Sequence, residues 1–150
     1  MKRNENIILL SRDHHFGLLC SWKIRQGLKK GIKVSRITKY VLHFWDSHLK
    51  EHFREEEQIL IPYLEDEFSQ RIQSEHQQLE AAISGMKGSE TADLLSYFAD
   101  LLEQHIRFEE RTWFPHLEAQ LNPADLEKIG KELDRIHHSE QDTYEDEFWK

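Results

Sequence analysis

The chain has 150 residues, with 20 Lys or Arg against 28 Asp or Glu, and its net charge of −8 argues against nucleic acid as the main partner. A single cysteine, Cys20, excludes an internal disulfide and a thiolate metal cage. The sequence also has no apolar run long enough to cross a membrane. We therefore predict one cytoplasmic domain over residues 1–150, with neither a membrane nor a nucleic-acid partner.

Apolar residues recur at helical spacing along most of the chain, and strand signals are missing. Asn122 and Pro123 form a helix start, with an N-cap followed by proline, for a fifth helix that ends near His138. The aromatic residues of the tail that follows are expected to pack on the surface of the bundle. The four longer predicted helices cover, in chain order, about residues 6–30, 35–66, 69–86 and 91–121. Short links between them predict an all-α fold: an antiparallel up-down four-helix bundle with a short C-terminal helical extension.

The second and fourth predicted helices contain the same sequence motif. Residues 52–65 (HFREEEQILIPYLE) and 105–118 (HIRFEERTWFPHLE) align without a gap at an offset of 53, with seven of fourteen positions identical. The proline of each copy, Pro62 or Pro115, should kink its helix or end its regular part. Two equivalent helices in a bundle imply a pseudo-two-fold axis through the core, and a group on that axis faces both copies.

Ten histidines in one chain are unusually many, and two of them occupy equivalent places in the repeat. Residues i and i+4 of a helix share a face, so His52 pairs with Glu56 and His105 pairs with Glu109. His76 in the third helix and a histidine in the first helix complete the set. His14 and His15 are both candidates there, and a leucine three residues on, as after His76, favours His15.

These six groups predict a dinuclear metal site. Buried carboxylates and imidazoles without partners are costly, and metal ions remove that cost. Glu56 and Glu109 are expected to bridge two cations, and the predicted ligands are His15, His52, Glu56, His76, His105 and Glu109. Nitrogen and oxygen ligands without thiolate suit iron, manganese, zinc or nickel, and two carboxylate bridges in a helical bundle favour iron or manganese.

Further residues near this pattern have alternative interpretations. Glu80 follows His76 by four residues and either replaces a missing histidine as a further ligand or points to solvent. His48 either supports His52 or lies on a plain helix face. Glu57 and Glu110 are expected to be solvated. An apolar wall around the metals is expected from Leu18, Trp22, Phe53 and Trp113, and surface or packing roles are expected for His43, His116, His137 and His138.

Taken together, these residues resemble the hemerythrin-like (HHE cation-binding) domain family over residues 8–118. The resemblance implies a four-helix bundle that holds two iron ions (Fe²⁺/Fe³⁺) with an oxo or hydroxo bridge, with manganese or zinc as possible substitutes. It implies that Glu56 and Glu109 bridge the irons, that His15 and His52 bind one, and that His76 and His105 bind the other.

The chain differs from the oxygen-carrying members of that family, which have a His-x-x-x-His pair in the third helix and an aspartate in the fourth. The resemblance therefore points to a non-haem di-iron protein that binds or senses O₂ or NO, or handles iron, with an unidentified redox or protein partner. The first alternative is an enzyme that repairs iron centres or reduces nitric oxide or peroxide, although no catalytic residue is assigned. The second is a metal-free helical interaction module.

Overall fold

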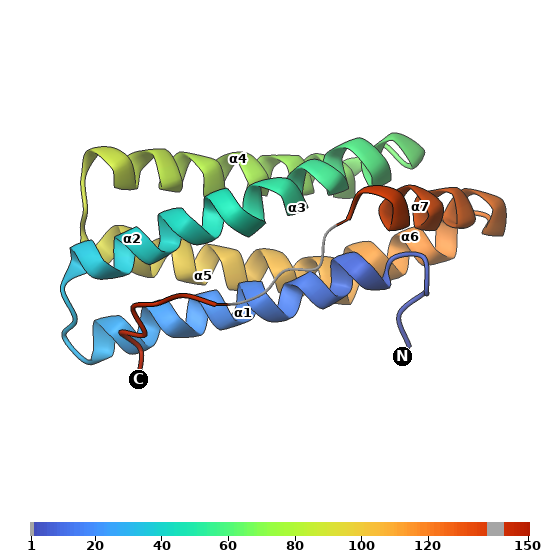
Figure 1. Cartoon of the computed structure of the whole chain (residues 1–150). Coiled ribbons are helices and arrows are strands. Elements are labelled where there is room, and N and C mark those ends of the chain that lie inside the picture. The colour runs from blue at the N-terminus through green and yellow to red at the C-terminus, as the bar shows by residue number, and fades with distance from the viewer. Residues whose placement is uncertain (1, 138–142) are drawn as a thin grey trace.

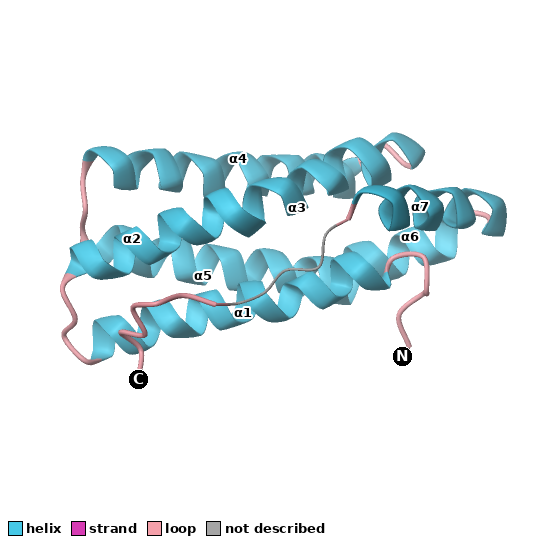
Figure 2. Ribbon diagram, in the orientation of Figure 1, coloured by secondary structure: helices cyan, strands magenta, loops and turns pink. Residues whose placement is uncertain are grey.

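A computed structural model of the chain describes residues 2–137 and 143–150, and all its regular structure within these ranges is helical. Figure 2 shows helices joined by short loops and no strand in the described part of the chain. The prediction of an all-helical fold is confirmed. None of the described helices is both long enough and apolar enough to cross a lipid bilayer.

The long helices lie side by side in the bundle (Figure 1), and the bounds of the elements define four rods. The first rod is α1 (Ile8–Lys29) and the third is α4 (Glu67–Gly88). The second rod is built in chain order from α2 (Val34–Phe44), η1 (Trp45–Leu49), α3 (Lys50–Glu55), η2 (Glu56–Leu60) and η3 (Ile61–Tyr63). The fourth consists of α5 (Ala92–Phe108), η4 (Glu109–Trp113) and α6 (Phe114–Gln120).

The repeated sequence produces a repeated local structure. Both η2 and η4 are short π-helical turns, and each begins at the repeated glutamate, Glu56 or Glu109. A proline has no N–H to donate and its ring clashes with the preceding turn, so Pro62 and Pro115 favour widened backbone just before them. After Pro62 the second rod ends within three residues, whereas after η4 the fourth rod resumes as α6. The predicted interruptions at both prolines are confirmed.

A polar layer divides the apolar core of the bundle into two clusters. One cluster contains Cys20, Phe53, Leu79 and Leu102, and the other contains Leu10, Ile72 and Trp113 among its members. On the first and third rods a buried histidine, His14 or His76, lies between residues of the two clusters, and on the second and fourth rods a buried glutamate, Glu56 or Glu109, does so, one turn after His52 or His105. The bundle therefore holds these side chains at one level, between two well-packed apolar blocks.

The C-terminal part of the chain adds α7 (Pro123–Ile136) and an aromatic tail. The Asn122 side chain caps α7 by accepting a hydrogen bond from the Asp125 N–H, as the sequence predicts. The tail residues Phe148 and Trp149 are buried against the bundle, and the Lys23 ammonium lies 4.0 Å from the centre of the Trp149 ring. The predicted packing of this tail is confirmed.

Candidate metal centre

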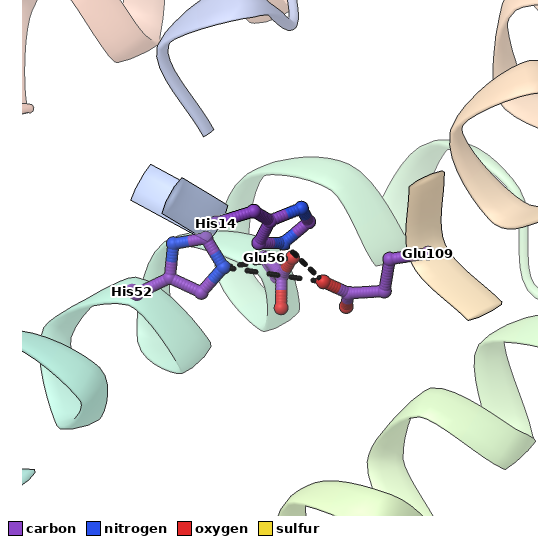
Figure 3. Close-up of side chains that lie close together, drawn as sticks. All are labelled: His14, His52, Glu56 and Glu109. Carbon is purple, nitrogen blue, oxygen red and sulfur yellow. Dashed lines mark hydrogen bonds and ion pairs between the residues drawn. The ribbon is translucent and has the colours of Figure 1, made fainter. Parts of the chain in front are cut away.

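Four histidines and two glutamates from all four rods converge in the polar layer. Two groups of potential ligand atoms form there, and within each group the atoms lie within 4.8 Å of one another. Glu56 and Glu109 belong to both groups. One group adds His14 and His52, which point toward the two glutamates in Figure 3, and the other adds His76 and His105. The arrangement follows the pseudo-two-fold symmetry predicted from the repeat.

The imidazole Nε2 atoms face the two central carboxylates at short distances. His14 Nε2 lies 2.7 Å from one oxygen of Glu109, and His105 Nε2 lies 3.2 Å from the other. His52 Nε2 lies 3.2 Å from one oxygen of Glu56, and His76 Nε2 lies 3.0 Å from the other. Each carboxylate therefore spans two imidazoles, with one oxygen toward each half of the site.

Every one of these histidines donates its other ring N–H to a carboxylate outside the centre. The Nδ1-to-oxygen distances lie between 2.6 and 3.0 Å. Such a bond fixes both the tautomer and the orientation of a metal-binding imidazole, and it leaves the Nε2 lone pair directed inward. The four pairs are His14 with Glu110, His52 with Asp13, His76 with Glu57, and His105 with Glu75.

This pattern fits a pair of cations at the centre. When Nδ1 carries the hydrogen of a neutral imidazole, Nε2 is an acceptor, and here it faces carboxylate oxygens that also only accept. A proton on each Nε2 or a shared cation must therefore separate the two kinds of group. Four buried atoms of the centre lack a hydrogen-bond partner: Nε2 of His52 and His105, and Oε2 of Glu56 and Glu109. These are atoms that metal ions would bind.

In the metal-free chain the pKa shifts of the central groups favour protonated imidazoles beside ionised carboxylates. Burial alone would lower the pKa of His105, but the charge of Glu109 and hydrogen bonds to Glu109 and Glu75 raise it to about 10. Burial would raise the pKa of Glu109, but the neighbouring imidazoles, His105 first, hold it well below its ordinary value. Cations must therefore displace protons from this site in order to bind.

Aromatic rings enclose the centre and limit its contact with water. The Phe53 ring stacks on His76 with centroids 3.9 Å apart, and the Phe114 ring stacks on His14 with centroids 5.3 Å apart. Trp113 is fully buried in the adjoining apolar cluster. The expectation that Trp22 contributes to this wall is wrong, because its side chain is 47% exposed on the outside of the bundle.

In the first helix the structure brings His14, and not His15, to the centre. His14 is buried and belongs to one of the two groups, whereas His15 is exposed to solvent. Adjacent residues of a helix point about 100° apart, so only one of them can face the core. The expectation of His15 is corrected on this point. The other five predicted side chains all lie in the two groups: His52, Glu56, His76, His105 and Glu109.

The structure also places the neighbouring residues, some of which had alternative interpretations and some of which differ from expectation. Glu80 is exposed and takes no part in the two groups. Glu57 and Glu110 are not simply solvated, because each accepts the Nδ1–H of a central histidine. His48 is buried beside His52, and burial lowers its pKa to about 4. Of the expected surface histidines, His116 bonds Asp66, His137 bonds Glu55, and His138 lies outside the described residues.

The outer carboxylates are the functional residues that sequence reasoning missed. A signal for them was present, because an acidic residue directly precedes the central histidine in both α1 and α4, as Asp13 before His14 and Glu75 before His76. The repeated Glu-Glu pairs supply the other two outer carboxylates from their second members. In each case the carboxylate supports a histidine on a different rod, so the pairing becomes visible only after folding.

A comparison with protein families identified a match. The family model described as the hemerythrin HHE cation binding domain matches residues 19–117. This range includes His52, Glu56, His76, His105 and Glu109, and it starts after His14. Neither a curated protein nor a solved structure matched the chain.

Proposed function

The chain belongs to the hemerythrin HHE cation-binding domain family, and from this premise we propose that residues 1–150 form one domain holding two metal ions in an up-down four-helix bundle. His14 and His52 would bind one ion, and His76 and His105 the other. Glu56 and Glu109 would be shared between the two. The observation that carries this proposal is the convergence of four inward-directed Nε2 atoms on two fully buried carboxylates.

Iron is the metal that we propose for the centre, with manganese or zinc as substitutes. The ligand set contains only imidazole and carboxylate groups, which suit these metals, and no thiolate lies in either group. A pair of irons, joined by an oxo or hydroxo bridge, would supply two-electron redox chemistry toward a small ligand. The single buried cysteine of the described chain suits a reducing compartment such as the cytoplasm.

The protein residues themselves would orient the ligands and control access. The outer carboxylates hold the four imidazoles with Nε2 inward, so little rearrangement is needed when cations bind. Phe53 and Phe114 exclude water by stacking on two of these rings. On the side of His52, a pocket of about 380 Å³ is lined by Asp13, His48 and His52 among others, which gives a small molecule a route to this half.

The centre contains only four histidine ligands, two for each metal position. This small number favours binding or sensing of a diatomic ligand, or iron handling. Each half of the site offers two imidazoles and oxygens from two shared carboxylates, and the exposed Glu80 adds nothing. Iron commonly takes six ligands, so positions would remain for O₂ or NO. We therefore propose an O₂- or NO-responsive protein.

The test is metal analysis of protein purified without a histidine tag and loaded with iron under anaerobic conditions. The proposal predicts about two irons per chain and spectral changes when O₂ or NO is added to the reduced protein. Fewer than about 0.2 irons per chain after loading, with no oxo-to-iron absorption, would overturn it. Catalytic turnover of NO or peroxide by the loaded protein would instead favour an enzyme.

A further inference from the structure

One of the four histidine–carboxylate pairs continues outward into the C-terminal helix. Asp13 accepts the Nδ1–H of His52 at 3.0 Å, and its second oxygen lies 3.3 Å from His137 Nε2. The other nitrogen of His137, Nδ1, lies 2.7 Å from Glu55. The side chains of His137, Asp13 and Glu55 are 4–7% exposed, and all three line the pocket beside His52.

The packing of α7 against the bundle sets the position of His137. His137 caps the C-terminus of α7, and its backbone N–H donates to the Leu133 carbonyl at 2.7 Å. Leu126, Ile129 and Leu133 anchor α7 in the apolar cluster on one side of the polar layer. The last turn of α7 therefore brings His137 to the edge of the polar layer, where it meets Asp13.

The other half of the pseudo-symmetric site has a different outer support. The counterpart of Asp13 is Glu75, which accepts the Nδ1–H of His105 at 2.7 Å. Glu75 is held in turn by Arg71 at 3.0 Å, and the Arg71 side chain is 53% exposed. Exposed ion pairs contribute little, whereas a buried hydrogen-bonded pair fixes geometry. The sequence repeat covers the second and fourth rods and does not include α7, which carries His137. Among the described residues, a buried outer support of this kind therefore occurs only at the half that contains His52.

We propose that His137 is a positioning residue for the metal centre: through Asp13 it fixes the ring of His52 and strengthens cation binding at the His14/His52 half, which makes the two halves unequal. This inference rests on the proposed di-metal function. The geometry supports it, since one oxygen of Asp13 faces Nδ1 of His52 and the other faces Nε2 of His137. An anionic Asp13 is the form that can accept from both rings.

The experiment is calorimetric titration of the metal-free protein with Zn²⁺, for the unmodified chain and for His137→Ala, with melting curves to confirm folding. We expect two ions in the unmodified protein. In His137→Ala one ion keeps its affinity and the other binds about 10–100-fold more weakly, which is the usual effect of removing an outer partner of a metal ligand. His137→Gln, whose amide can donate to Asp13, should recover much of this loss.

Two further variants separate a positioning effect from a general loss of stability. His116→Ala removes an equivalent histidine–carboxylate contact, 2.7 Å from Asp66, at a place outside both groups, and should change neither affinity. Arg71→Ala should change the affinities less than about twofold, because its support is exposed. The rings of ¹⁵N-labelled His52 and His105, observed by NMR at one equivalent of Zn²⁺, show which half fills first.

The outcomes distinguish this inference from the proposed function. If the unmodified protein binds no Zn²⁺ and no iron, the di-metal function itself fails. If it binds two ions and His137→Ala binds both with unchanged affinity, or weakens both equally, the positioning role of His137 is refuted. A selective loss at the half that contains His52, restored by His137→Gln, supports it.

Discussion

The substitution Glu109→Gln tests the centre most directly. Glu109 is fully buried, and its two oxygens lie 2.7 Å from His14 Nε2 and 3.2 Å from His105 Nε2. Because it belongs to both groups, a neutral amide in its place removes a charge from both cation positions at once. We expect the variant to lose paired metal binding, whereas loss of a histidine should affect one half.

The magnitude follows from the linkage between binding and folding. One cation at a free concentration of about 100 times its Kd stabilises the folded chain by about 2.7 kcal/mol, so two cations give about 5 kcal/mol. For a chain of 150 residues, this corresponds to a rise in Tm of about 10–20 °C on metal addition. Glu109→Gln should abolish most of that rise.

The assay compares each variant with and without metal, because Glu109→Gln also changes the metal-free protein. Removing one partner of a buried ion pair costs about 3–5 kcal/mol, so the absolute Tm alone would mislead. The matched control is Glu80→Gln, since Glu80 follows His76 at the same spacing as Glu109 follows His105 but is exposed. The reasoning is refuted if Glu109→Gln still binds two ions, or if Glu80→Gln loses them.

The remaining predictions concern the first helix, pH and a helix cap. His14→Ala should remove about one metal ion per chain by elemental analysis, and His15→Ala should remove none. The reverse result would show that His14 is not the ligand from the first helix. The pKa of His105 is raised from 6.5 to about 10, so the metal-free chain should keep that stabilisation below pH 6.5 and lose about 1.4 kcal/mol per pH unit as the pH rises toward 10. Metal-bound histidines must be deprotonated, so the gain in Tm on metal addition should grow over the same range, and a gain that shrinks would contradict this. Asn122→Ala removes the α7 cap and should lower the free energy of unfolding in urea by about 0.5–2 kcal/mol, whereas no change would mean that the cap is not used.

The sequence alone was sufficient to predict the helices and most of the chemistry of the centre. Helical spacing and the Asn122–Pro123 start are local signals, and the structure confirms them within a few residues. The gapless repeat identified two His–Glu pairs of the centre, His52 with Glu56 and His105 with Glu109. The same spacing on two rods indicated that both pairs occupy equivalent positions facing the core. Family membership rests on the same stretch of chain.

Tertiary structure decided which side chains face the centre and what supports them. His14 and His15 have the same chemistry, and Glu80 has the same spacing from its histidine as Glu109, yet packing exposes His15 and Glu80. The outer carboxylates and His137 act across helices far apart in the chain, and α7 is held in place by its apolar face. Local spacing fixes the direction of a side chain relative to its own helix, but the rotation of each helix about its axis depends on burying apolar surface against the others.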